Sequence, residues 1–484
     1  IPDSMRRGLF MRFNRSDVAI KQVRHRLRDQ VEDFILDALN VIIMTLSFAI
    51  FWLKYYSHNV ARSYAGIWDL SIIVFFMIVY AFCYRLYKSV QVSEHLIRES
   101  LFNGLLSNIL AIFGAIIVMF VWRAHMFSLV PLLLLLINDT VLCFVFAVIE
   151  NNTFIRLHRP RKATVILNQN EFNMQLLSTK LKAIYAKVDI IHVDDCLSNI
   201  REVLADSDDL YLSDLPEEKR TIIVNYALSQ DLDTFVLPQV GDAIMSASHP
   251  SHIFHLPIFK IERFNPSIFY LFFKRFFDIV LSLMALIILS PIMIIIAIAI
   301  KAEDHGDVFF KQTRLTKNGQ EFMILKFRSM TMQAEADGVA RLSTGKNDQR
   351  VTKVGKIIRP LRLDELPQLI NIFKGDMSIV GPRPERPEIA NAYVAKVPEF
   401  DLRLQAKAGL TGYAQVYGQY NTSPHDKLLM DLSYIATPNL LEDFRLCLAT
   451  IKVIFVPEST DGIEEGQVNA LQEGETHENT SRSA

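Results

Sequence analysis

Four long apolar stretches fill the first third of this 484-residue chain and constrain its fold more than any other feature. They cover residues 34–53, 67–83, 101–121 and 127–149. Each is close to the ~20 residues that a helix needs to cross the hydrocarbon layer of a membrane. Hydrophobic residues make up 51% of the chain and are clustered in this way, which excludes a wholly soluble or disordered protein. The sequence therefore predicts a bundle of four transmembrane helices over residues 34–150.

Lys and Arg gather on alternate sides of these stretches. Residues 1–33, 84–100 and 150–162 together contain fifteen of them, whereas the two intervening loops contain three. Because cytoplasmic loops carry an excess of basic residues, we expect a basic cytoplasmic N-terminus (1–33) and a cytoplasmic exit from the bundle. The net charge of −1 provides no overall positive field, so no nucleic-acid partner is expected.

Two polar residues, Asn138 and Asp139, lie near the middle of the fourth stretch. An acid inside a membrane helix is a functional candidate by default. The alternative is a packing contact within the bundle, and the residues alone leave both interpretations open.

Residues 160–265 change character. Short β-branched runs at 163–167, 188–193, 221–224 and 234–237 alternate with helical stretches such as 171–186. This alternation is typical of an α/β domain with a parallel sheet. The turn after the first run, Asn168-Gln-Asn-Glu-Phe172, contains no glycine that would let a pyrophosphate approach the backbone. We therefore predict a Rossmann-like cytoplasmic domain that does not bind a dinucleotide.

A fifth apolar run extends from residue 276 to 300 and contains Ser290-Pro291. Proline lacks the backbone N–H and clashes with the preceding helical turn, so it predicts a break there. The halves, 276–289 and 292–300, would be only about 21 and 14 Å long at ~1.5 Å per residue, too short to cross a bilayer. We predict a re-entrant membrane helix, with a proline-kinked true span as the alternative. The acidic stretch 458–484 contains no aromatic residue and predicts a disordered tail.

Alternating residues on either side of Asn318-Gly319 predict a β-hairpin, whose second strand contains Lys326 and Arg328. Two residues apart on a strand, these cations share one face. Such a face suits a phosphate-bearing ligand, because Arg forks onto phosphate and Lys adds a point charge. A solvated basic surface is the alternative interpretation.

Adjacent acids, Asp364 and Glu365, follow Arg359 and Arg362 in an apolar-flanked segment. Nearby cations favour the ionised form of both acids. A carboxylate can attack phosphorus as a nucleophile, and a second one can help to hold Mg²⁺. Downstream, Gly381-Pro-Arg-Pro384 predicts a rigid loop that presents Arg383.

From Lys274 to about Phe455 the sequence closely resembles the bacterial sugar transferase family. These are monotopic phosphoglycosyl transferases, and their large form is called polyprenyl-phosphate hexose-1-phosphate transferase. The matching segments, in order, are Lys274-Arg275, Ser290-Pro291, Lys326-Phe-Arg-Ser-Met330, Leu363-Asp-Glu-Leu-Pro-Gln368, Gly375-Asp-Met-Ser378, Val380-Gly-Pro-Arg-Pro384 and Gly409-Leu-Thr-Gly412. The first 265 residues match the large subclass by architecture more than by motif.

The resemblance implies a reaction and roles for named residues. A hexose 1-phosphate, expected to be glucose or galactose, would pass from a UDP-sugar to undecaprenyl phosphate in the bacterial inner membrane. This is the first step of exopolysaccharide, capsule or O-antigen synthesis. Asp364 would be the nucleophile and Glu365 its partner, both beside Mg²⁺, and an α/β catalytic domain would cover residues 274–456. Lys326, Arg328, Arg359 and Arg383 would hold phosphates, Ser290-Pro291 would form the re-entrant break, and the enzyme would be a homodimer.

Two other classes of protein remain to be weighed. A non-catalytic membrane scaffold or sensor predicts a damaged catalytic motif, yet Leu363-Asp-Glu-Leu-Pro-Gln368 is intact. A polytopic phosphotransferase for phospholipid headgroups would carry its acids within spanning helices, and here they follow the broken apolar run. Both observations favour the transferase.

Overall fold

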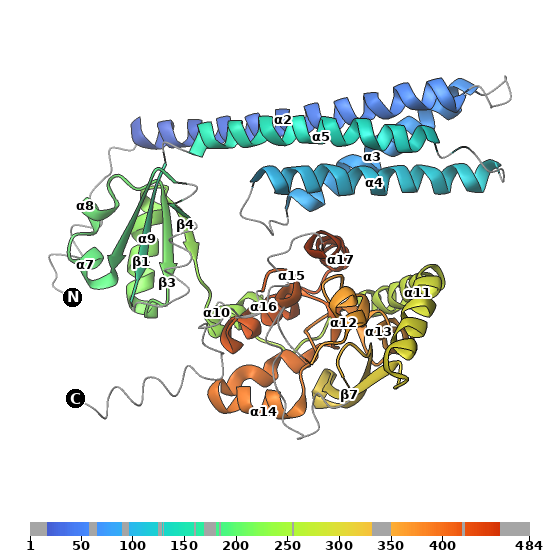
Figure 1. Ribbon diagram of the computed structural model, residues 1–484. Helices are drawn as coiled ribbons and strands as arrows, with labels where there is room; N and C mark the ends of the chain where they lie inside the picture. Colours follow the sequence, from blue (N-terminus) through green and yellow to red (C-terminus); the bar gives the residue numbers. More distant parts are fainter. Residues whose placement is uncertain are drawn as a thin grey trace. The chain divides into compact units, whose positions relative to one another are not determined.

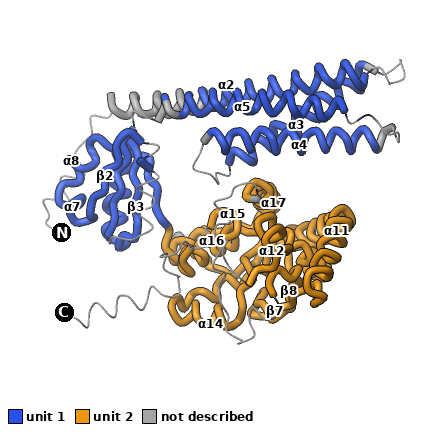
Figure 2. Tube along the Cα trace, in the orientation of Figure 1, with its two compact units in different colours: residues 1–237 blue, residues 238–484 orange. Residues whose placement is uncertain are grey.

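The protein is described by a computed structural model over residues 17–57, 65–89, 96–123, 128, 130–158, 161–168, 181–182, 185–253, 256–331, 350–418 and 422–454. The chain forms two compact units, residues 1–237 and 238–484 (Figure 2). Segment 238–265, which the sequence analysis assigned to the α/β domain, therefore falls in the second unit. The predicted tail 458–484 and most of the expected helix at 171–186 lie outside the described residues.

Four long helices open the first unit (Figure 1): α2 (Asp17–Tyr55), α3 (Ala65–Lys88), α4 (Leu96–Arg123) and α5 (Val130–His158). Each contains one of the four apolar stretches. They pack on one another around a shared core in which Phe48 and Phe76 stack with ring centroids 4.1 Å apart. Large apolar side chains such as Ile50 and Phe113 are exposed on the outer faces. This pattern, apolar both inside and outside, is typical of helices surrounded by lipid.

Asp139 lies fully buried among three of these helices. Its carboxylate accepts hydrogen bonds from the Ser47 hydroxyl of α2 (2.5 Å) and the Asn108 amide of α4 (2.8 Å). The Asn138 amide in turn donates to the Ser47 oxygen at 2.9 Å. Asp139 and Asn138 thus make the packing contacts that were one of the two alternatives for them.

Replacement of Asp139 by alanine should destabilise the helices, because it leaves buried polar groups of Ser47 and Asn108 without their partner. An unsatisfied buried group costs about 1–3 kcal/mol. Thermal unfolding in detergent should show a lower midpoint for Asp139→Ala than for Asp139→Asn, since an amide still accepts one hydrogen bond. Equal midpoints for both variants and wild type would show that the cluster contributes nothing to stability.

A parallel four-stranded sheet forms the rest of the first unit, in the order β2-β1-β3-β4. Its strands are β1 (Lys162–Leu167), β2 (Lys187–His192), β3 (Asp209–Ser213) and β4 (Asp233–Val236), and its helices are α7 (Val193–Ser198), α8 (Ile200–Leu204) and α9 (Glu217–Ser229). The predictions of strands at 163–167, 188–193 and 234–237 are confirmed. The prediction of a strand at 221–224 is wrong, because this run lies inside α9, and β3 was missed.

The second unit combines short strands with many helices. It begins with α10 (Val240–Ser246), the hairpin β5 (His249–Ile253) and β6 (Leu256–Lys260), and the long helix α11 (Ile268–Asp304). The predicted hairpin is confirmed as β7 (Phe309–Leu315) and β8 (Glu321–Phe327), turning through left-handed Asn318 and Gly319. There follow α12 (Lys353–Ile358), the 3₁₀ helix η4 (Leu363–Glu365), α13 (Gln368–Lys374), β9 (Ser378–Val380), α14 (Pro387–Lys396), η5 (Pro398–Gln405), β10 (Gly409–Thr411), α15 (Tyr413–Val416), α16 (Pro424–Ala436) and α17 (Leu440–Ile454).

Helix α11 corrects one prediction. Residues 276–289 and 292–300 are not separate helices, because α11 runs without interruption from Ile268 to Asp304 with Pro291 inside it. Pro291 has no N–H to donate to the carbonyl of Ile287, one turn earlier. The Ser290 hydroxyl donates to that carbonyl at 2.8 Å and so replaces the missing donor.

Basic and acidic residues in the first half of α11 attach it to the second unit. Lys274 forms an ion pair with Asp443 of α17 at 2.8 Å, and Asp278 accepts a hydrogen bond from the backbone N–H of Ile379 at 2.9 Å. The Arg275 guanidinium donates to the carbonyls of Ile372 (2.7 Å) and Phe373 (2.8 Å) at the end of α13. Much of the other surface of α11 is apolar and exposed, for example at Ile287, Ile288 and Ile295. With the four N-terminal helices it makes five described helices long and apolar enough to cross a bilayer, which is consistent with a multi-pass membrane protein.

The short parallel strands β9 and β10 meet at glycines. The N–H of Gly381 donates to the carbonyl of Thr411 at 2.8 Å, and the N–H of Gly409 donates to the carbonyl of Pro382 at 2.9 Å. A Cβ on Gly409 would lie 2.1 Å from the nitrogen of Gly381, so the two backbones touch directly. This contact fixes the start of the loop that carries Arg383.

Candidate active site

Glu365 lies at the centre of the candidate site. Its carboxylate oxygen Oε1 is 2.9 Å from the Lys326 ammonium on β8 and 3.5 Å from the Arg383 guanidinium on the loop after β9. Burial opposes ionisation, but the nearby charges of Lys326, Arg383 and Arg362 hold the pKa of Glu365 well below its usual range. The lowered pKa favours the ionised form of Glu365, which contacts cations from two parts of the chain, Lys326 and Arg383.

Asp364, the preceding residue, has a different environment. Among the described residues, its carboxylate makes no ion pair and no hydrogen bond to another residue. Burial, together with repulsion from Glu365, raises the pKa of Asp364, while Lys326 and Arg359 act in the opposite direction. A carboxylate with a raised pKa is more basic and hence a better nucleophile than an ordinary one. The two adjacent acids therefore differ in their partners. Glu365 forms ion pairs with Lys326 and Arg383, whereas Asp364 forms none with any described residue.

Two arginines on the segment between α12 and η4 complete the positive surroundings. Arg359 caps the end of α12, and its Nη1 is buried with no hydrogen-bond partner in the described part of the chain. Arg362 adopts a left-handed backbone conformation (φ 53°), which turns the chain from α12 into η4. Burial lowers the pKa of Arg362, although nearby Glu365 favours its charged form. Sequence analysis noted Arg362 beside the acids but did not assign it to the site.

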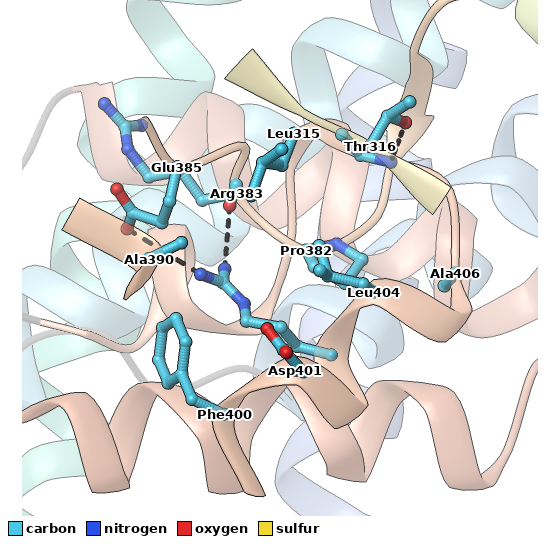
Figure 3. A pocket seen from close by; sticks show the side chains of 12 residues that line it. Leu315, Thr316, Pro382, Arg383, Glu385, Ala390, Phe400, Asp401, Leu404 and Ala406 are labelled. Atoms are coloured by element: carbon cyan, nitrogen blue, oxygen red, sulfur yellow. Dashed lines mark hydrogen bonds and ion pairs between the residues drawn. The ribbon is translucent and has the colours of Figure 1, made fainter. Parts of the chain in front are cut away.

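The loop that presents Arg383 is held by other arginines. The Arg314 guanidinium donates to the carbonyl of Pro384 at 3.1 Å, and Arg403 donates to the carbonyl of Arg383 at 2.7 Å. Arg403 also forms an ion pair with Asp431 of α16 at 2.7 Å. A small pocket beside this loop is lined by Arg383, Glu385, Phe400 and Asp401 among others (Figure 3). The Arg383 side chain itself is 45% exposed and thus accessible to a ligand.

Sequence analysis missed Arg314, Arg403 and Asp431. Arg314, Arg403 and Asp431 lie 69, 20 and 48 positions from Arg383 along the chain, and no short motif joins them to it. Burial raises the pKa of Asp431 to about 6, partly offset by Arg403. A charged residue with so little exposure (Asp431 1%, Arg403 3%) is recognised only once the fold is known.

The structure does not bring Arg328 into this cluster. Strand β8 ends at Phe327, and the Arg328 guanidinium contacts Asp304 at the end of α11 instead. Of the four cations predicted to hold phosphates, Lys326 and Arg383 contact Glu365, and Arg359 acts electrostatically on Asp364. No cluster of three or more His, Cys, Asp or Glu suited to a metal ion is present among the described residues.

Comparison with known proteins identifies the family of this chain. Residues 269–457 match the family model described as bacterial sugar transferase. The "UDP-N-acetylgalactosamine-undecaprenyl-phosphate N-acetylgalactosaminephosphotransferase" of Aeromonas hydrophila is 35% identical over 249 residues, covering 51% of this chain and 57% of that protein. The "UDP-glucose:undecaprenyl-phosphate glucose-1-phosphate transferase" of Caulobacter vibrioides is 38% identical over 191 residues, covering 38% of this chain and 71% of that protein.

A third relative is the "Exopolysaccharide production protein PSS" of Rhizobium leguminosarum bv. phaseoli. It is 38% identical over 187 residues, which are 37% of this chain and 92% of that protein. The family-model match includes nearly all of α11, together with Lys326, the Asp364–Glu365 pair and Arg383. This chain belongs to the bacterial sugar transferase family.

Proposed function

We propose that this protein transfers a hexose 1-phosphate from a UDP-sugar to undecaprenyl phosphate, the first step in building a lipid-linked polysaccharide. The observation that carries the proposal is the environment of the Asp364 carboxylate. It makes no ion pair among the described residues, follows the cations Arg359 and Arg362 in the chain, and precedes Glu365, which is paired with Lys326 and Arg383. Such an arrangement offers a nucleophile to phosphorus and positive charge to a diphosphate. The names of the relatives support the same type of reaction.

The chemistry proceeds in two displacements at one phosphorus. An Asp364 oxygen forms a bond to the sugar-side phosphorus, the bridging P–O bond breaks, and UMP leaves with the electron pair. The sugar phosphate is then held as an acyl phosphate on Asp364. A phosphate oxygen of undecaprenyl phosphate attacks the same phosphorus, the bond to Asp364 breaks, and the carboxylate is regenerated. The cations offset the negative charge that approaches in both steps.

Magnesium fits this site through Asp364 more than through Glu365. Mg²⁺ in proteins is held by one or two carboxylates together with substrate phosphates and water. Asp364 has free oxygens, whereas Glu365 is paired with Lys326 and Arg383. When bound, the ion would neutralise charge on the diphosphate. Addition of EDTA should then abolish turnover, and Mg²⁺ should restore it.

The membrane arrangement follows from the apolar helices. We propose that α2–α5 span the bacterial inner membrane and that α11 dips into its cytoplasmic leaflet, so that the four-stranded sheet of the first unit and the rest of the second unit lie in the cytoplasm. The attachment of α11 through Lys274, Arg275 and Asp278 supports a helix fixed to the catalytic unit. The Rossmann-like sheet then has a structural or regulatory role, and the homodimer predicted from the family resemblance remains a prediction.

Release of UMP by the purified membrane enzyme tests the proposed reaction. Undecaprenyl phosphate should be combined in turn with UDP-glucose, UDP-galactose and UDP-N-acetylgalactosamine. We expect release with UDP-glucose or UDP-galactose and none without the lipid beyond a single turnover. Absence of release with every UDP-sugar would contradict the proposal and favour a non-catalytic membrane scaffold.

Arg383→Ala should weaken UDP-sugar binding. The guanidinium is partly exposed, so it can fork onto a phosphate of the substrate, and a hydrogen bond to a charged group contributes about 1.5–3 kcal/mol. We therefore expect kcat/KM to fall by roughly 10- to 150-fold, chiefly through KM. Lys396→Ala, an exposed cation on α14, is the matched control and should behave like wild type. Unchanged kinetics of Arg383→Ala would assign Arg383 a structural role only.

A further inference from the structure

The C-terminal end of α11 contacts two other segments: the residue that follows β8 and the start of α12. Its last residues, Glu303 and Asp304, are followed by left-handed His305 (φ 55°) and by Gly306. We call Glu303, Asp304 and their partner Arg328 the α11 junction.

Arg328 uses its whole guanidinium at this junction. Its Nη1 donates to the Asp304 carboxylate at 2.6 Å, Nη2 donates to the other oxygen of the same carboxylate, and Nε donates to the carbonyl of Asp307 at 2.7 Å. The residue is only 8% exposed. Its guanidinium fills the space beside Gly306, where a Cβ would lie 2.7 Å from Nη1. Arg328 therefore ties the end of β8, one residue after Phe327, to the end of α11.

Glu303 attaches the start of α12 to the same point. Its carboxylate accepts hydrogen bonds from the backbone N–H groups of Lys353 (2.7 Å) and Val354 (3.2 Å). These are orphan donors in the first turn of a helix, which an acid there satisfies. The N–H of Thr352 also donates to the carbonyl of Ser329 at 3.1 Å, so α12 and the end of β8 contact each other directly.

Apolar packing continues from the junction towards the site. Ile296 and Ile300 of α11 form one buried cluster with Phe327 and Ile358, and Leu363 packs against it. Phe327 directly follows Lys326, Ile358 directly precedes Arg359, and Leu363 directly precedes Asp364. The end of α11 is thus connected to the supports of all three.

We propose that Glu303, Asp304 and Arg328 are positioning residues, which use the end of the membrane helix α11 to fix Lys326 and Arg359 near Asp364. The proposal rests on the proposed function, because it assigns these cations to the substrate diphosphate. It also gives Arg328 a role other than phosphate binding. A misplacement of about 1 Å in such a site can cost up to 10²-fold in rate, so the junction controls substrate handling.

Gly306→Ala is the sharpest test, because it changes no charge and adds one methyl group where the Arg328 guanidinium lies. The guanidinium is the far end of a flexible side chain and can move aside, so the variant should fold. We expect KM for the UDP-sugar to rise about tenfold, with a similar effect for Arg328→Gln and a smaller one for Arg328→Lys. Gly241→Ala on α10 has open space around its new Cβ and should match wild type.

Wild-type and Asp364→Asn assays run in parallel separate this proposal from the proposed function. If the wild type releases UMP but Gly306→Ala and Arg328→Gln keep wild-type kcat and KM, the positioning role is overturned. If the wild type releases no UMP, the proposed function fails, and thermal unfolding still tests the junction. Asp304→Arg and Arg328→Asp should each lower the midpoint, and their combination should restore it by exchanging the charges. Failure of the double variant to recover would show that the two residues do not act as a pair.

Discussion

Asp364→Asn should reduce UMP release to background. An amide oxygen is a poor nucleophile towards phosphorus and cannot leave again as a carboxylate, so neither displacement can occur. The change is nearly isosteric, and no described residue forms an ion pair with this side chain, so the folded structure should remain. The thermal unfolding midpoint should stay near that of wild type.

Isotope exchange distinguishes the covalent route from a single displacement. In the absence of lipid, wild-type enzyme should exchange labelled UMP into the UDP-sugar, and Asp364→Asn should not. Asp206→Asn, on the surface of the first unit, is the matched control and should retain both turnover and exchange. Full turnover without exchange in the wild type would contradict a phosphosugar–Asp364 intermediate.

Replacement of both Ser290 and Pro291 by alanine should abolish activity for a different reason. The missing N–H and the ring clash of a proline together destabilise a helix interior by about 3 kcal/mol or more. An alanine at 291 removes the clash and supplies an N–H that can donate to the Ile287 carbonyl, which the Ser290 hydroxyl contacts in the wild type. A proline inside a continuous helix kinks it, so α11 without Pro291 can straighten, and its apolar run at 276–300 is long enough to span. Straightening would carry the residues after α11, with Asp364, to the far side of the membrane, away from the UDP-sugar.

Cysteine labelling in intact cells measures this outcome. A cysteine placed within 458–484 should resist an impermeant reagent in the wild type and react with it in the double variant. Ser282→Ala is the matched control, because its hydroxyl also donates to a carbonyl one turn back, that of Ile279, but no proline follows it. Labelling of the tail in the wild type would contradict the re-entrant arrangement itself.

Local patterns sufficed where local physics decides the structure. Clustered apolar residues gave the long helices, and the Asn318-Gly319 turn gave the β7–β8 hairpin. The prediction failed at 221–224, where β-branched residues resemble a strand. Pro216, Glu217 and Glu218 just upstream are typical of a helix start and contained the missing signal.

Long-range partners could not be predicted from spacing. Lys326 and Arg328 have equal charge and lie two positions apart, yet one contacts Glu365 and the other Asp304. The difference arises because β8 ends between them and because α11 ends beside Arg328. In the same way, the adjacent acids look equivalent in the sequence, and only the placement of Lys326 and Arg383 on Glu365 leaves Asp364 free.

The contact between β9 and β10 determines which substitutions this region tolerates. A Cβ on Gly381 would lie 2.2 Å from the carbonyl oxygen of Lys407, and one on Gly412 would lie 2.3 Å from that of Gly381. These obstacles are backbone atoms, which cannot move aside as a side chain can. In a saturation mutagenesis experiment, Gly381, Gly409 and Gly412 should therefore reject every residue, alanine included, and their variants should be lost from the membrane as misfolded protein. Arg383, two positions after Gly381, should instead yield variants that accumulate normally but are less active. Measuring protein abundance beside activity would thus separate, within one short motif, residues needed for folding from those that contact the substrate.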